Sequence, residues 1–168
     1  MDTLTLAELL VRPPPPADPF PLKRILVACD LTPAAANAAA RAALLAREHG
    51  AWLRLLCVRP RRSHLAAAQA RLDALAAQLQ ERTGVAVLAQ AVAGSVGREL
   101  KDAAADADLL VLRCAGRKPL VDWLAGWHPA RLLRHCERPV LVVRKPAAVA
   151  YRRVLASVAF DGRAAHVI

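Results

Sequence analysis

Leu109-Leu-Val-Leu-Arg-Cys-Ala-Gly-Arg117 is followed first by Gly126 and then by Arg138-Pro-Val-Leu-Val-Val-Arg144. The two ends of this stretch are short, nearly continuous apolar runs, as in strands that are buried on both faces of a parallel sheet. The glycines between them have the spacing of a loop that approaches phosphate, because a residue without a side chain lets the backbone come close to a ligand. The stretch therefore predicts two parallel strands with a damaged phosphate-loop-like segment between them, which leaves two alternatives: the protein binds a nucleotide, or it has kept the scaffold and lost the ligand.

The chain before this stretch shows the same alternation. From Arg24 onwards, apolar runs too short to be helices are followed by alanine- and leucine-rich segments long enough to be helices, which predicts β-α-β units. With right-handed crossovers and helices on both faces, the predicted fold is a five-stranded, doubly wound parallel α/β sheet. The expected helices cover about 33–49, 64–83, 95–105 and 120–135. The expected strands are Ile25–Asp30, Trp52–Val58, Val85–Val92, Asp108–Leu112 and Pro139–Val143.

The ends of the expected helices carry sequence signals. Thr32 is a good N-cap residue before Pro33 at the first helical position, and Ser95 can cap the third helix. Gly50 and Gly84 stand where two helices should stop, because glycine readily adopts the left-handed conformation that ends a helix.

Three segments are expected along the chain. Residues 1–21 hold a short amphipathic stretch and a run of prolines, which we interpret as a leader and a stiff linker, and residues 22–146 form the α/β domain. In residues 147–168, Tyr151-Arg-Arg-Val-Leu-Ala-Ser-Val-Ala159 repeats the pattern of Leu22–Asp30, with Ala159 in the place of the aspartate. This last segment is the start of a second repeat, a dimerising tail that pairs with a sheet edge, or a coincidence between two apolar strands.

Composition limits the classes of function. The 168 residues are 56% hydrophobic and only 4% aromatic, which predicts one compact domain with a core of Ala, Val and Leu. The formal net charge of +10 permits an anionic partner, but the basic residues are dispersed, as on a solvated surface. No apolar run is long and uncharged enough to cross a bilayer, and no basic region precedes residues 4–11, so we expect a cytoplasmic protein without a membrane partner.

Several short motifs, taken in order, resemble the universal stress protein family. They are Arg24-Ile-Leu-Val-Ala-Cys-Asp30, Ala93-Gly94, Ala107-Asp-Leu-Leu-Val-Leu112, Gly116, Gly126 and Arg138-Pro-Val-Leu-Val-Val143, and the match covers about 22–145. The resemblance implies an adenine-nucleotide alpha-hydrolase-like fold with strand order 3-2-1-4-5. It also implies a homodimer through the edge strand, here Val140, Leu141, Val142 and Val143.

The resemblance also locates a nucleotide site. ATP-binding members of the family wrap the phosphates and ribose with glycine, two residues, glycine, nine residues, and then Gly-Ser or Gly-Thr. At these positions the present chain has Arg113, Gly116, Gly126 and Trp127. Two of the four are lost, because a side chain at Arg113 occupies space that the backbone needs and Trp127 offers one donor on a bulky ring. His128 follows as a weak helix cap.

Two residues of this site have competing interpretations. Arg113 can plug the cleft or, with Arg117 and Lys118 nearby, clamp phosphate in place of backbone contacts. Asp30 can accept a hydrogen bond from ribose, or it can serve the strand-to-helix turn before Leu-Thr-Pro. Val58 would line an adenine slot. The nucleotide-binding residues that the resemblance assigns are Ala28, Asp30, Val58, Leu112, Arg113, Gly116, Gly126, Trp127 and His128.

Cysteines also gather at this edge of the expected sheet. Cys29, Cys57 and Cys114 fall at the carboxyl ends of strands that the implied order makes neighbours. They can line the rim of the ligand cleft, or they can be small buried side chains. The sequence shows no Cys-x-x-Cys, metal-ligand spacing or nucleophile motif, so we expect no catalytic residue and no metal site.

These observations favour a regulatory or interaction module in stress adaptation over an enzyme. The module would have a degenerate nucleotide site, no cofactor and a protein partner that the sequence does not identify. The alternative is an ATP-binding protein that takes ATP with Mg²⁺, with or without slow hydrolysis. Nucleic-acid binding is a weaker third class, because no recognition helix or aromatic stacking platform can be identified.

Overall fold

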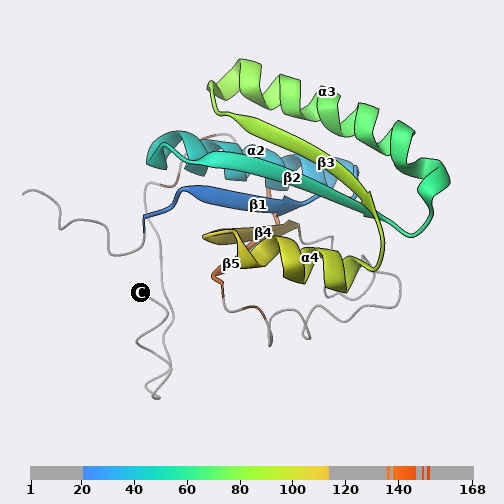
Figure 1. Ribbon diagram of the computed structural model, residues 1–168. Helices are drawn as coiled ribbons and strands as arrows, with labels where there is room; N and C mark the ends of the chain where they lie inside the picture. Colours follow the sequence, from blue (N-terminus) through green and yellow to red (C-terminus); the bar gives the residue numbers. More distant parts are fainter. Residues whose placement is uncertain (1–20, 114–135, 137, 147–148, 150, 152–168) are drawn as a thin grey trace, which may run out of the picture.

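The chain forms a five-stranded parallel sheet with helices on both faces (Figure 1). The computed structural model describes residues 21–113, 136, 138–146, 149 and 151. The sheet order is β3-β2-β1-β4-β5, and every pair of neighbouring strands is parallel, so the predicted fold class and strand order are confirmed. The strands are β1 (Arg24–Ala28), β2 (Trp52–Arg59), β3 (Val87–Ala93), β4 (Leu109–Arg113) and β5 (Val140–Val143). The helices are α2 (Pro33–His49), the short 3-10 helix η1 (Arg62–His64), α3 (Leu65–Thr83) and α4 (Val96–Ala105).

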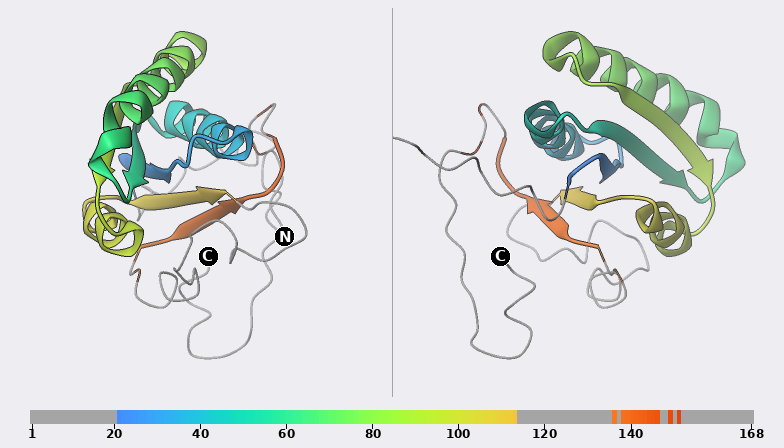
Figure 2. Two further views of the ribbon diagram at one scale, coloured as in Figure 1. Left: turned by 90° about the vertical axis from the view of Figure 1, so that its right-hand side faces the viewer. Right: turned by 60° about the vertical axis from the view of Figure 1, so that its left-hand side comes forward.

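The sheet separates two hydrophobic cores. Figure 2 shows α2 and α3 on one side of the sheet and α4 on the other. Alternate residues of each strand enter opposite cores, so that Ile25 and Val27 pack under α2 while Leu26 and Ala28 pack under α4. The buried face of α2 consists mainly of alanines, which bring the helix axis close to the strands. These alanines are Ala35, Ala38, Ala39, Ala42, Ala43 and Ala46.

The predicted helix ends are mostly confirmed. Thr32 Oγ1 accepts a hydrogen bond from Ala35 N at 3.3 Å, and Gly50 and Gly84 end α2 and α3 with φ of 62° and 71°. Ser95 stands at the N-cap position of α4 as predicted, but its side chain makes no capping hydrogen bond. The helix expected over 120–135 lies outside the described residues.

Several strand bounds differ from the sequence prediction. β1 ends at Ala28 because the chain turns out of the sheet before Asp30, and Leu31 adopts a left-handed φ of 65° in this turn. β3 begins at Val87, two residues later than predicted, because Val85 is buried in the core ahead of the ladder with β2. β4 continues through Arg113, whose backbone lies opposite Val143 of β5.

An ion pair joins the amino ends of β1 and β4. Asp108 Oδ2 accepts hydrogen bonds from Lys23 N at 3.0 Å and from Arg24 N at 2.8 Å, and Oδ1 accepts from Arg24 Nη2 at 3.2 Å. Partial burial acts to raise the pKa of Asp108, but these donors outweigh it and hold the pKa below its usual value. The carboxylate thus stabilises the start of two central strands.

Part of the chain after β5 lies against α2. Arg41 is buried in α2, its Nη1 donates to Val149 O at 2.7 Å, and its guanidinium lies 3.9 Å from the centroid of the Tyr151 ring. Val149 and Tyr151 belong to the segment predicted as a second repeat or dimerising tail, most of which lies outside the described residues. In the described part of the chain, no helix is long and apolar enough to span a membrane.

Candidate functional site

The predicted cleft lies at the carboxyl ends of β1 and β4, where Asp30 and Arg113 meet. Arg113 Nη2 is 2.7 Å from Asp30 Oδ2, and Arg113 Nε donates to the same oxygen at 2.9 Å. The two side chains are only 9% and 21% exposed, respectively. Such a charge-assisted contact is stronger than a neutral hydrogen bond, and partial burial keeps water from competing with it.

The second oxygen of Asp30 is also engaged. Asp30 Oδ1 accepts hydrogen bonds from Thr32 Oγ1 at 2.6 Å and from Thr32 N at 3.1 Å. Because Thr32 also caps α2, Asp30 connects the β1–α2 turn to the end of β4. Asp30 therefore builds the turn after β1, and its other carboxylate oxygen is occupied by Arg113.

Of the remaining predicted site residues, the structure describes three and leaves four outside the described part of the chain. Ala28 and Leu112 are each 2% exposed and pack in the core beneath α4, so their side chains face away from any ligand in the cleft. Val58 is half-buried at the end of β2 and packs against the same core. The structure thus brings Ala28, Asp30 and Arg113 to one edge of the sheet. The other four predicted residues, Gly116, Gly126, Trp127 and His128, lie outside the described residues.

Two of the three cysteines predicted near the cleft are buried. Cys29 and Cys57 belong to the core under α2 and α3, and Cys114 lies outside the described residues. Burial raises the pKa of the Cys29 thiol to about 11 and also raises that of Cys57, although the nearby charge of Arg59 opposes the second shift. Both thiols are therefore protonated at neutral pH, which favours their interpretation as small core side chains.

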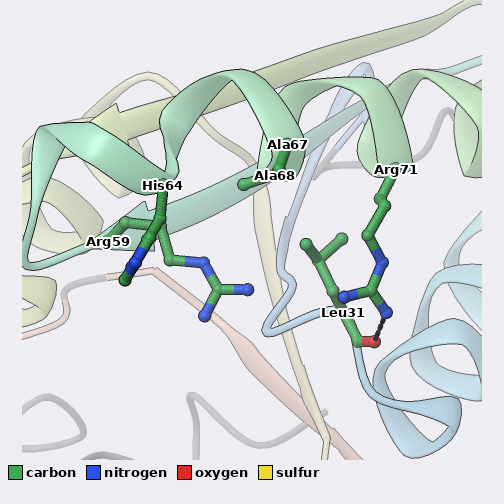
Figure 3. A pocket seen from close by; sticks show the side chains of 6 residues that line it. All are labelled: Leu31, Arg59, His64, Ala67, Ala68 and Arg71. Carbon is green, nitrogen blue, oxygen red and sulfur yellow. Dashed lines mark hydrogen bonds between the residues drawn. The ribbon is translucent and has the colours of Figure 1, made fainter.

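The sequence analysis missed a group of basic side chains beside the predicted cleft. Arg59 at the end of β2, His64 before α3 and Arg71 in α3 surround a hollow of about 240 Å³, whose other lining residues are Leu31, Ala67 and Ala68 (Figure 3). Arg71 Nη2 donates to Leu31 O at 3.0 Å, which supports the left-handed turn after Asp30. The run Arg59-Pro-Arg-Arg-Ser-His64 was the available signal, but Arg71 joins it only through the folding of α3.

Among the described residues, no cluster of His, Cys, Asp or Glu has the composition needed to hold a metal ion. The chemistry of the cleft is instead that of one satisfied carboxylate and an arginine, next to a hollow with a positive lining.

An open parallel sheet of order 3-2-1-4-5, with helices on both faces and an acidic residue after β1, defines a doubly wound α/β protein. The family model described as "Universal stress protein family" matches residues 21–144. The chain therefore belongs to the universal stress protein family. No curated protein sequence matches it significantly.

Solved structures agree with this assignment. A universal stress protein in complex with cAMP is 22% identical, with a TM-score of 0.61 over 73% of this chain and 97% of that chain. A member of the family from Burkholderia pseudomallei is 30% identical, with a TM-score of 0.55 over 75% of this chain and 97% of that chain. The Archaeoglobus fulgidus protein in complex with dAMP is 18% identical, with a TM-score of 0.56 over 73% of this chain and 98% of that chain.

Proposed function

We propose that this universal stress protein is a regulatory or interaction module of stress adaptation, whose nucleotide cleft is closed by the Asp30–Arg113 ion pair. The observation that carries the proposal is that both oxygens of Asp30 already have close donors. A ribose hydroxyl could use this carboxylate only by displacing Arg113 or Thr32. That exchange would break charge-assisted hydrogen bonds in a partly buried setting, for which a neutral hydroxyl is a weaker replacement.

The position of Arg113 supports the same function. The family motif has a glycine here, whereas Arg113 is the last residue of β4 and is paired in register with β5. Its side chain lies over the end of β1, where nucleotide would need space. The residues present therefore do not fit ATP with Mg²⁺ in the arrangement that the family motif implies, and we propose a role that needs no cofactor.

Adenine-nucleotide binding is the second candidate. Two similar structures hold cAMP and dAMP, which are small enough to need fewer phosphate contacts than ATP. In this alternative Arg113 would leave Asp30 and clamp a phosphate with its planar fork of donors. The binding of cAMP, AMP and ATP by the full chain separates the two candidates.

The experiment compares the wild type with Arg113→Gly and Arg113→Ala. Protein purified without added nucleotide is denatured and its supernatant examined for adenine compounds, and nucleotides are then titrated by calorimetry. The proposal expects no retained nucleotide and no binding heat in the wild type, with measurable binding after Arg113→Gly because the cleft is opened. Nucleotide bound by the wild type at one per chain, and weakened at least tenfold by Arg113→Ala, would instead establish the clamp.

We also propose that the module acts as a homodimer through β5. This strand is the sheet edge, Val142 is 39% exposed on it, and an apolar edge strand favours pairing with a second copy. Val142→Lys should shift the mass measured by light scattering from dimer to monomer, whereas Leu88→Lys on the opposite edge should not. A wild-type monomer at high protein concentration would contradict the proposed dimer.

A further inference from the structure

Three arginines have a buried nitrogen without a hydrogen-bond partner among the described residues, and one of them, Arg59, lines the hollow beside Leu31. Arg41, Arg54 and Arg59 each have a buried Nε without a hydrogen-bond partner among the described residues. The first two still donate through a terminal nitrogen, Arg41 to Val149 O and Arg54 to Gln90 Oε1. Within that same part of the chain, Arg59 donates to no oxygen atom, although its guanidinium points into the hollow (Figure 3). Its side chain does contact the buried thiol of Cys57, but sulfur is a weak acceptor, so this half-buried cation still favours an oxygen acceptor.

The polar side chains that line the hollow with Arg59 are basic. Arg71 faces it across the hollow and His64 lies beside it (Figure 3), while Arg61 and Arg62 are exposed in the intervening turn. In the described part of the chain no carboxylate forms an ion pair with any of these residues, and the nearby Asp30 is already engaged by Arg113. The site is therefore complementary to an anion of more than one charge.

The start of α3 adds to this field. α3 begins at Leu65, its first turn contains no acidic residue, and its N-cap residue His64 makes no capping hydrogen bond. Two lining residues, Ala67 and Ala68, belong to this first part of the helix and leave space for a ligand. A helix amino end carries a partial positive charge, which here reinforces the two arginines.

We propose that Arg59, His64 and Arg71 form a binding site for a phosphate group, carried by a small monoester or free in solution. A phosphate monoester bears nearly two negative charges at pH 7, which matches two guanidinium groups better than the single charge of a monocarboxylate. The volume of about 240 Å³ is small for a nucleotide and sufficient for a compact ester against Leu31 and the two alanines. The site lies on the β2 and α3 side of the Asp30 turn, so it does not depend on opening the family cleft.

The test uses the full chain with glycerol phosphate and inorganic phosphate as probes, at constant ionic strength. Arginine Nε–H resonances are followed by NMR, with Arg59→Gln identifying the peak of interest, and affinities are measured by calorimetry. The expected result is a saturable shift of the Arg59 peak and at least tenfold weaker binding in both Arg59→Gln and Arg71→Gln. The ratio of the two probe affinities shows whether the ester or the free anion is the better ligand.

Arg82→Gln is the matched control. Arg82 is exposed on the same helix, roughly 16 Å from Arg71 along its axis, and the variant removes the same charge. Its phosphate affinity should stay within twofold of the wild type. Equal weakening in all three variants would overturn the proposal in favour of diffuse charge attraction, and absence of saturable binding in folded wild-type protein would overturn it directly.

Two further probes separate this site from other anion-binding roles. Preferential binding of a DNA duplex over glycerol phosphate, lost in Arg59→Gln and Arg71→Gln, would replace the proposal with a nucleic-acid surface. Binding of AMP by the wild type that is weakened in Arg113→Ala but not in Arg59→Gln would place the ligand in the family cleft and contradict the proposed function without supporting this site. Circular dichroism and the unfolding temperature of each variant establish that the comparison is made between folded proteins.

Discussion

Asp30 and Arg113 are 83 residues apart in the sequence, and their side chains meet at the carboxyl ends of β1 and β4, with Nη2 2.7 Å from Oδ2. The contact joins the turn after β1 to the last residue of β4. Both residues are among those that the family resemblance assigns to nucleotide binding. This pair is the structural reason for proposing a module that works without nucleotide.

The Asp30–Arg113 pair should stabilise the fold. Asp30→Asn is expected to lower the free energy of unfolding by about 1–3 kcal/mol, because it removes the carboxylate charge that pairs with the mostly buried Arg113. Urea denaturation measures the change, and Asp73→Asn on the exposed face of α3 should alter it by less than about 0.5 kcal/mol. An equally small effect of Asp30→Asn would show that the pair contributes little.

Asp108 should make stability depend on acid pH. Its pKa is lowered in the folded state, so its contribution is present above the pKa of about 3.9 in the unfolded chain and is lost as the pH falls through the folded value. Asp108→Asn should cost about 1–2 kcal/mol at pH 7 and much less at pH 2.5, as measured by denaturant unfolding. Asp102→Asn, which changes an exposed residue of α4, provides the control. A cost that is independent of pH would indicate that the charge of Asp108 is unimportant.

The buried thiols should be unreactive in the native protein. In a Cys114→Ser, Cys136→Ser variant, only Cys29 and Cys57 remain among the cysteines of this chain. A thiol reagent at pH 8 should label neither until the protein is unfolded, because burial excludes the reagent and raises the pKa of both groups. Rapid labelling before unfolding would restore the hypothesis that these cysteines line an accessible cleft.

A larger side chain on the buried alanine face of α2 should destabilise the protein. Ala39 is fully buried between α2 and the sheet, so Ala39→Leu is expected to cost about 1–3 kcal/mol through overpacking. Ala77→Leu on the exposed side of α3 introduces the same side chain where there is space, and alanine and leucine have similar helix propensity. Thermal unfolding of the two variants gives the comparison. Equal unfolding temperatures would mean that α2 packs more loosely against the strands than its burial indicates.

Local sequence patterns were sufficient for most secondary structure. As predicted, α2 begins after Thr32 with Pro33 and ends at Gly50. These ends could be predicted because helix capping and the left-handed conformation of glycine depend on only a few neighbouring residues. Strand ends were less predictable. Asp30 directly follows an apolar run and was included in the expected strand, but the position of the turn is decided by its hydrogen bonds to Thr32 and by the support that Arg71 gives to Leu31.

The sequence by itself determined the parallel α/β architecture and the family, because the alternation of short apolar runs with alanine-rich segments and the order of short motifs are properties of the chain alone. Only the tertiary structure decided that Arg113 turns onto Asp30 and that Arg71 joins Arg59 and His64 around one hollow. The physical reason is that charge pairing acts over a few ångströms in space. The sheet and α3 bring these residues together, and their separation in the sequence does not indicate that they are close.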